Sequence, residues 1–342
     1  MQFPISVLVP IYNVEDYIEK CARSLFNNTI ASKCQFIFTN DCSTDSTIER
    51  LNKVIEDFPK LKKNIIVQHH EKNMGLGKTR NTGFDKAKGE YIICVDSDDW
   101  VEANYLEELL NKANEGNYDV VGCDNFISPD YNYPDNAKEE RIKKQVLNQD
   151  PKICLKDIYE DKTGSFVWIK LIKREFLIKN NIRWDDEISI LEDMLICTKI
   201  FSNNPTVAYL PKALYHYVVR SGSYTTGFYN IEKADKFFLA LSYINKYIKK
   251  MNVSYALEPY NILAYRIKYP ILLNGTSSTQ KKYLSIHKEL NKYATLKNTK
   301  FIYYLVIKIS SFSAKLAFCI LHIFSLTKCM LRKISYNGYM EK

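Results

Sequence analysis

The sequence predicts an α/β fold in which a mostly parallel sheet is flanked by helices, with a helical C-terminal extension. Two observations predict this class. Over residues 1–125, short apolar runs alternate with segments of helical period, and polar signatures follow several of the runs. The chain has 342 residues, of which 46% are hydrophobic and 25% charged, so we expect a large buried core rather than disorder.

The first half of the chain can be divided into strands and helices from its hydrophobic pattern. Short apolar runs predict strands at residues 5–10, 35–39, 64–68, 90–95 and 120–123. Segments of helical period predict helices at residues 15–27, 46–58, 77–88 and 105–113. This alternation favours parallel strands with helices on both faces. The polar segment 128–149 is expected to be an excursion or lid.

Polar side chains follow three of the predicted strands. Tyr12 follows the first strand, Asp41 the second, and the acidic sequence DSDD at 96–99 the fourth. Ligands of such sheets bind beyond the carboxyl ends of the strands. We therefore expect these separate segments to converge on one crevice, which is a stronger indication than any single motif.

The DSDD sequence has a functional and a structural interpretation. Clustered carboxylates repel one another unless a cation or another partner holds them. Mg²⁺ takes carboxylate oxygens and commonly bridges to substrate phosphates, so Asp96 and Asp98 are candidate ligands for a nucleotide diphosphate site. The alternative is a solvated turn that caps the helix after Trp100.

Asp41 and Asp45 are assigned different tasks. Asp41 could accept a hydrogen bond from a base or a ribose hydroxyl, whereas Asp45 is expected to cap the following helix. Tyr12 could stack on a flat base, although it could also be a rim aromatic.

The sequence GKT at 77–79 imitates the end of a phosphate-binding P-loop. Such a loop requires a glycine five positions before Gly77, and position 72 is Lys. An ATPase is therefore not favoured. We expect a loop leading into a helix, with Lys72 and Arg80 facing anionic phosphates.

Charge and cysteine content limit the partners and the compartment. The net charge of +9 suits anionic partners such as nucleotides, nucleic acid or anionic lipid, without choosing among them. The nine cysteines lack metal-binding spacing and are expected to be buried, reduced thiols, which implies a reducing compartment. The N-terminus carries no evident secretory signal. We expect a cytoplasmic protein.

The C-terminal stretch 301–331 is apolar but interrupted by basic residues. Lys308, Lys315 and His322 recur at every seventh position, which places them on one stripe of a helix. These charges argue against a spanning helix. With the basic residues Lys328, Arg332 and Lys333, the pattern favours a helix lying in a membrane interface, while a core helix is the alternative.

Four stretches of the first hundred residues resemble family 2 glycosyltransferases of the GT-A fold, of the inverting, non-processive bacterial type. In order they read SVLVPIYN at 6–13, NDCSTDST at 40–47, NMG with TRN within 73–81, and GEY with DSDD within 89–99. Position 42 is Cys where the family usually has Gly, so a positive φ there would be strained. Residues 168–171, 192–193 and 215–223 resemble the acceptor half more loosely.

The resemblance implies both an activity and an organisation of the chain. A nucleotide diphosphate sugar, expected to be UDP-linked, would donate a hexose or N-acetylhexosamine to a glycan acceptor. The basic amphipathic tail, rather than the resemblance, suggests that the acceptor is lipid-linked and that the protein lies at the inner face of the plasma membrane. Nucleic acid is not an expected partner. The resemblance implies a GT-A domain at 1–228 (donor half 1–125, acceptor half 150–228). The rest of the chain matches nothing specific in the family, and its hydrophobic pattern predicts a helical region at 229–300 and a membrane-associating helix at 301–342.

The resemblance also assigns roles to individual residues. The residues expected to bind the nucleotide sugar are Pro10, Tyr12, Glu15, Asp41, Lys72, Arg80, Asp96 and Arg220. Asp98, together with Asp96, would hold Mg²⁺ or Mn²⁺, and Asp193 would be the general base. His216 is a further candidate metal ligand, although a structural histidine is the favoured interpretation.

Asp193 opens a segment of helical period, so a simple acidic helix start is the alternative to catalysis. A carboxylate at a helix N-terminus keeps a low pKa, so a base at this position must gain its basicity elsewhere or from geometry. Two other classes of protein stay open. One is another nucleotide-dependent enzyme, an NTPase or nucleotidyltransferase, and the other is a catalytically inactive sugar-nucleotide-binding relic.

Overall fold

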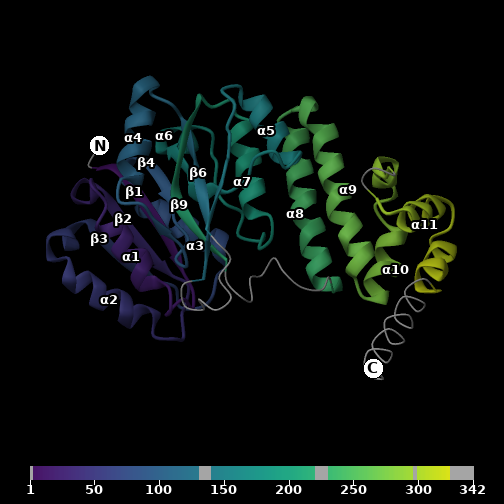
Figure 1. Cartoon of the computed structure of the whole chain (residues 1–342), viewed down its shortest axis with the longest axis horizontal. Coiled ribbons are helices and arrows are strands. Elements are labelled where there is room, and N and C mark those ends of the chain that lie inside the picture. Colours follow the sequence, from purple (N-terminus) through teal and green to yellow (C-terminus); the bar gives the residue numbers. More distant parts are fainter. Residues whose placement is uncertain (1–2, 131–139, 220–229, 296–298, 324–342) are drawn as a thin grey trace, which may run out of the picture. The chain divides into compact units, whose positions relative to one another are not determined.

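The computed structural model describes residues 3–130, 140–219, 230–295 and 299–323 (Figure 1). The chain divides into two compact units. The first comprises Met1–Ser223 with Ser242–Ala256, and the second comprises Tyr224–Leu241 with Leu257–Lys342. Every strand that the structure describes belongs to the first unit.

The strands of the first unit form one sheet in the order β3-β2-β1-β4-β8-β6-β9-β5, with β7 paired to β6. Their bounds are β1 Phe3–Ile11, β2 Gln35–Asn40, β3 Ile65–His69, β4 Gly89–Cys94, β5 Trp100–Val101, β6 Val120–Pro129, β7 Arg141–Lys143, β8 Lys170–Lys173 and β9 Val207–Val219. The four strands β3, β2, β1 and β4 are parallel. The antiparallel strand β8 then separates them from the parallel pair β6 and β9.

Helices cover both faces of the parallel strands. The helices that lie wholly within this unit are α1 Ile18–Phe26, α2 Thr47–Asp57, α3 Leu76–Lys86, α4 Tyr105–Gly116, α5 Pro151–Tyr159, α6 Arg174–Lys179 and α7 Glu192–Phe201. Val7 and Val9 of β1 share a core with residues of α1, α2 and α4. Leu8 points to the other face, where Gly83 of α3 lies against it. This alternation fixes which residues of β1 each layer buries.

The predicted α/β class is confirmed, and two segments differ from expectation. The strand predicted at 120–123 continues to Pro129, because the buried Asp124 accepts hydrogen bonds from Gln145 N (2.6 Å) and from the Tyr209 hydroxyl (2.7 Å). The Asp124 carboxylate therefore has hydrogen-bond partners inside the sheet, and the strand can continue through this polar residue. The expected excursion 128–149 was partly wrong, since β7 within it pairs with β6.

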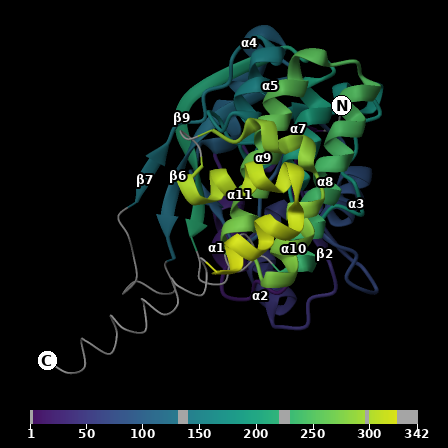
Figure 2. The same cartoon turned by 90° about the vertical axis from the view of Figure 1, so that its right-hand side faces the viewer.

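The second unit is helical in its described part (Figure 2). Its helices are the first part of α8 Ile231–Lys250, α9 Leu257–Asn274, α10 Ser277–Ser285 and α11 Phe301–Phe312. Lys268 is buried, and its Nζ donates to the carbonyls of Ile286 and His287 at 2.9 Å each. These bonds hold the chain that leaves α10 against α9. Burial lowers the pKa of Lys268 to about 8.

The helix expected over 301–331 is not continuous in its described part, residues 301–323. It is interrupted at Ser313, whose backbone is extended, and a second helical stretch covers 314–323. The serines around this point compete for backbone groups, as the Ser310 hydroxyl does by donating to Ile307 O at 2.7 Å. Within the described residues, no helix is both long and apolar enough to cross a bilayer. Lys328, Arg332 and Lys333 lie outside the described residues.

Candidate active site

The carboxyl ends of β1, β2 and β4 lie at one edge of the sheet, since these neighbouring strands are parallel. Contacts link the segments that follow them. Thr44 N donates to Asn13 Oδ1 at 2.9 Å, and Gly75 N, at the start of α3, donates to Asp41 Oδ2 at 2.8 Å. Helix α3 then carries Arg80 to Asp96, which follows β4. The expected convergence at this edge therefore occurs.

Arg80 joins two carboxylates that are far apart in the sequence. Its side chain is 1% exposed, with Nη1 2.8 Å from Asp193 Oδ1 and Nη2 3.0 Å from Asp96 Oδ1. Glu192 Oε1 lies 3.8 Å from Nη1. Burial lowers the pKa of Arg80, but the charges of Asp193 and Asp96 raise it further, so the group stays a cation. Two partly buried carboxylates require such a partner.

The prediction that Arg80 faces phosphates is corrected by this geometry. Both of its terminal nitrogens donate to carboxylates, and its Nε is buried without a hydrogen-bond partner. A guanidinium matches carboxylates through its planar fork, which explains why arginine occupies this position. Arg80 therefore positions acidic residues from two halves of the unit.

Asp193 lies in the first turn of α7, which begins at Glu192 after a left-handed residue, Leu191 (φ 59°). One carboxylate oxygen accepts from Arg80, and the other accepts from Val167 N at 3.1 Å. Burial raises the pKa of Asp193, although Arg80 opposes the shift. Burial also raises the pKa of Glu192 to about 7. Burial therefore raises the pKa of these carboxylates, against the lowering that a position at a helix N-terminus causes.

The DSDD turn is held from two directions. Asp96 is 26% exposed and accepts from Arg80, while Asp99 is buried and accepts from Val218 N at 2.8 Å. Asp98 is half-buried. Helix α4 starts only at Tyr105 with Asn104 as its N-cap, so the capping interpretation of this sequence is wrong.

The donor set of this turn fits a hard divalent ion, because Asp96 and Asp98 offer carboxylate oxygens at the expected phosphate side of the edge. Among the described residues, no group of three or more His, Cys, Asp or Glu side chains is gathered as a complete metal site. Mg²⁺ is commonly bound by one or two carboxylates, with substrate phosphates and water completing the shell. Two carboxylates therefore fit part of the shell of such an ion.

His216 does not join this turn as a ligand. Its ring is stacked between Trp100, with centroids 3.4 Å apart, and Phe126, at 4.4 Å. Nε2 lies 2.7 Å from Glu102 Oε1, and Nδ1 lies 3.0 Å from both Ser128 Oγ and Glu140 Oε1. Since both ring nitrogens have protein partners, the structural interpretation holds and the metal-ligand prediction is corrected. Arg220 lies outside the described residues.

Asp41 organises the loop that leads into α3. Its carboxylate is 5% exposed and accepts from Met74 N (2.7 Å) and Gly75 N (2.8 Å), and it pairs with His70 Nδ1 (2.7 Å). Lys72 is exposed on the same loop. Asp41 therefore already has several protein partners at the place where we expect the base and ribose.

Cys42 has the positive φ at which a residue other than glycine is strained, since its φ is +66°. The N-cap of α2 is Ser46 rather than the predicted Asp45, but Asp45 contacts the same helix start, with Thr47 N donating to its Oδ1 at 3.1 Å. Glu15 faces the same helix start, since its Oε2 accepts from Ser46 N at 2.9 Å. Tyr12 is 49% exposed beyond β1, whereas Pro10 is buried within that strand.

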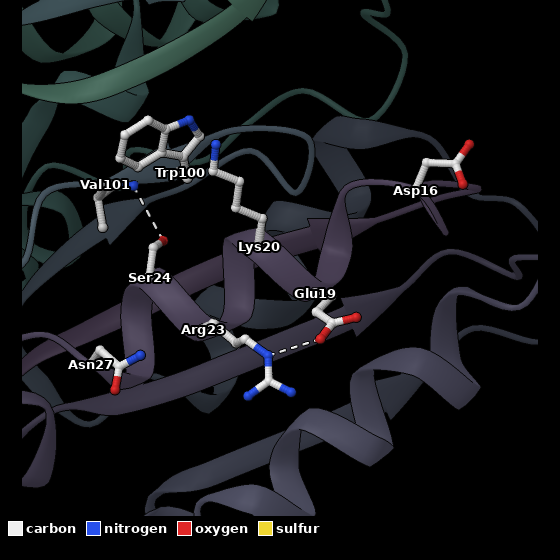
Figure 3. Close-up of a pocket in the computed structure, with 8 residues that line it drawn as sticks. All are labelled: Asp16, Glu19, Lys20, Arg23, Ser24, Asn27, Trp100 and Val101. Atoms are coloured by element: carbon white, nitrogen blue, oxygen red, sulfur yellow. Dashed lines mark hydrogen bonds and ion pairs between the residues drawn. The ribbon is translucent and has the colours of Figure 1, made fainter. Parts of the chain in front are cut away.

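A separate pocket of about 490 Å³ lies along α1 and β5 (Figure 3). Several of its charged groups are engaged with one another or with neighbours. Arg23 pairs with Glu19 at 2.9 Å and with Asp57 at 2.6 Å, while Lys20 Nζ lies 4.2 Å from the centre of the Trp100 ring. None of the predicted site residues lines this pocket.

Comparisons with known proteins show which family this chain resembles. The sequence profile described as glycosyl transferase family 2 matches residues 6–179. The uncharacterized glycosyltransferase EpsJ of Bacillus subtilis (strain 168) is 33% identical over 226 residues, covering 65% of this chain and 62% of EpsJ. The minor teichoic acid biosynthesis protein GgaB of the same organism is 29% identical over 223 residues, covering 64% of this chain and 23% of GgaB.

Solved structures share the fold. A fragment of S. aureus TarS in complex with UDP has a TM-score of 0.65 at 19% identity, covering 94% of this chain and 91% of that fragment. The mannosyltransferase PcManGT from Pyrobaculum calidifontis, in complex with GDP-Man and Mn²⁺, has a TM-score of 0.54 at 15% identity, covering 92% of this chain and 88% of that protein.

Proposed function

Because this chain belongs to glycosyl transferase family 2, we propose that it is an inverting enzyme that transfers a hexose or N-acetylhexosamine from a UDP-sugar to a hydroxyl of a glycan. The observation that carries this proposal is the Arg80 bridge, which brings Asp193 and Asp96 to one guanidinium. A base and a phosphate-side carboxylate must flank one reacting centre in such a displacement. The bridge supplies that proximity.

The proposed mechanism gives Asp193 the role of general base. It takes the proton of the acceptor hydroxyl while the oxygen bonds to the anomeric carbon and the bond from that carbon to the diphosphate breaks. One displacement inverts the anomeric centre. Arg80 orients Asp193, and Val167 N–H fixes its second oxygen.

Asp98, with Asp96, would hold Mg²⁺ or Mn²⁺, which would neutralise negative charge on the leaving diphosphate. The residues proposed for the uridine side are Asp41, Tyr12, Pro10, Glu15 and Lys72. Support for Tyr12 and Lys72 comes from their exposure, and Asp41 is hydrogen-bonded to the loop 70–75, which carries Lys72. Arg220 is proposed for the diphosphate by resemblance alone.

We propose that the acceptor is a lipid-linked glycan of a cell-surface polysaccharide and that the C-terminal helices contact the membrane. GgaB, whose name assigns it to teichoic acid biosynthesis, supports the polysaccharide. The large apolar side chains exposed on the described part of the tail are Phe301, Leu305, Phe312, Leu316 and Ile323. Lys308 and Lys315 lie among them, a combination that suits an anionic bilayer surface.

The membrane proposal can be tested on the full chain with vesicles of neutral lipid and of neutral lipid mixed with phosphatidylglycerol. We expect sedimentation with the anionic vesicles only, and its loss in the double variant Phe301→Asp, Phe312→Asp. A protein that stays in the supernatant with both vesicles, or a double variant that sediments like the parent, contradicts membrane contact.

The donor proposal is tested by a thermal-shift screen of UDP-, GDP- and dTDP-sugars with Mn²⁺, because a ligand that binds the folded state raises its stability by mass action. We expect stabilisation by a UDP-sugar in the presence of Mn²⁺, and UDP release once an acceptor is added. Hydrolysis of ATP without any sugar-nucleotide binding would favour an NTPase. Donor binding with no turnover on any acceptor would favour an inactive relic.

A further inference from the structure

The last carboxylate of the DSDD sequence, Asp99, faces inward. Asp99 is 2% exposed, and its two carboxylate oxygens have separate partners on β9. Oδ1 accepts from Val218 N at 2.8 Å, and Oδ2 accepts from the Tyr215 hydroxyl at 2.7 Å. With both oxygens engaged inside the protein, Asp99 ties this turn to strand β9.

The Tyr215 hydroxyl contacts the turn at a second point. Its oxygen accepts from Asp96 N at 3.1 Å while its proton is donated to Asp99. The backbone closes the same turn, because Asp99 N donates to Asp96 O at 3.1 Å. One phenol oxygen therefore holds both ends of the turn that contains Asp98.

The position of Tyr215 leaves little freedom. Its side chain is fully buried and stacks on Trp168, with ring centroids 4.3 Å apart, and it meets Tyr105 edge-on at 6.0 Å. Its strand also pairs with β5 directly after the turn, where Val101 lies opposite Tyr215. The hydroxyl therefore sits on a rigid support rather than on a mobile side chain.

From this geometry we infer that Tyr215 and Asp99 are positioning residues for the divalent metal, holding Asp96 and Asp98 in place from the acceptor half of the unit. The inference rests on the proposed function. Neither residue touches the metal or the substrate in this role. Groups that orient the ligands of a metal typically change its affinity about 10- to 100-fold when they are removed.

The inference separates Tyr215 from an ordinary buried tyrosine, and the chain offers a matched control. Tyr105 is equally buried and packs against Tyr215, but its hydroxyl donates to Trp168 O at 2.5 Å instead of to the turn. Tyr215→Phe and Tyr105→Phe each delete one buried hydroxyl. Only the first deletion removes a contact to the DSDD turn.

The experiment measures Mn²⁺ affinity by titration calorimetry on the full chain at saturating UDP, with melting temperatures recorded for each variant. We expect Tyr215→Phe to weaken Mn²⁺ binding at least tenfold, and Tyr105→Phe to leave it within about twofold despite a comparable drop in melting temperature. Asp99→Asn, which keeps an acceptor for Val218 N–H, is expected to weaken Mn²⁺ binding as well.

Equal Mn²⁺ affinities in the parent and Tyr215→Phe would overturn the inference while leaving the proposed function intact. Equal weakening in both tyrosine variants would also overturn it, since a general loss of packing would then explain the result. A parent protein that binds neither UDP nor Mn²⁺ would instead contradict the proposed function, and the inference with it.

Discussion

The guanidinium of Arg80 lies 2.8 Å from the carboxylate of Asp193, a residue 113 positions further along the chain. The same guanidinium reaches Asp96 at 3.0 Å. Helix α3, the turn after β4 and the start of α7 are thereby joined through one buried cation. The proposed chemistry depends on this junction more than on any single motif.

Replacing Arg80 by Lys keeps the charge but removes the fork that reaches two carboxylates. We expect kcat to fall at least about tenfold, because Asp193 and Asp96 would lose their common partner. Arg23→Lys is the matched control, since Arg23 also bridges two carboxylates, Glu19 and Asp57, but on the surface. Equal kcat values in the two variants would contradict a role of Arg80 in positioning Asp193 and Asp96.

Glu192 should make stability depend on pH. Burial raises its pKa from 4.5 to about 7, so the folded state binds more protons than the unfolded chain between these values. Its contribution to the free energy of unfolding therefore falls as pH rises through this window. Relative to the parent, Glu192→Gln should gain on the order of 3 kcal/mol at pH 8 and almost nothing at pH 4.

Urea denaturation of both proteins at these two pH values measures the difference. Glu56→Gln, on the exposed surface of α2, controls for loss of one negative charge. A Glu192→Gln variant with the same pH dependence as the parent would show that the pKa of Glu192 is not raised in the folded protein.

Asp98→Asn should abolish Mn²⁺-dependent donor binding, because an amide oxygen is a weaker ligand for a hard cation than a carboxylate. The measurement is the melting-temperature shift produced by a UDP-sugar with Mn²⁺ and with EDTA. The parent should lose its shift in EDTA, and the variant should lack the shift in both conditions. A variant that keeps the Mn²⁺-dependent shift would exclude Asp98 from the metal site.

Cys42→Gly should stabilise the protein by about 0.5–1 kcal/mol, since glycine adopts positive φ without the steric cost that a side chain incurs. The cysteine sits at φ +66°. Cys42→Ala is the control, because alanine keeps the Cβ atom that causes the strain. If alanine and glycine shift the urea midpoint equally, the strain at this backbone position is not the cause.

The donor half could be predicted from sequence because its information is local. Each of the first four apolar runs was bounded by turn residues, so these strands were placed within two residues, whereas the strand at 120–123 was predicted six residues too short. The comparison of position 42 with Gly pointed to strain on the condition that φ is positive there, as it is. The parallel order then required Asp41 and Asp96 to share one edge of the sheet.

The contacts that complete the site were not predictable in this way. Arg80 was expected to face phosphates. The sequence gives no sign that its partners are Asp96 and Asp193, since these residues meet Arg80 only in the folded chain. The hydroxyl of Tyr215 reaches the DSDD turn across 119 positions, and nothing in its local sequence signals this. The break at Ser313 was missed because the prediction followed the apolar residues at helical spacing and gave no weight to Ser310, Ser311 and Ser313.

The most direct test of the central claim is the variant Asp193→Asn, assayed for sugar transfer and for UDP binding in parallel. Asparagine keeps the size of the side chain and an oxygen for Arg80 but cannot take the acceptor proton. We predict that transfer falls about 10²- to 10⁴-fold while UDP affinity with Mn²⁺ stays within about twofold of the parent. Transfer at the parental rate in a folded, UDP-binding Asp193→Asn protein would contradict the account.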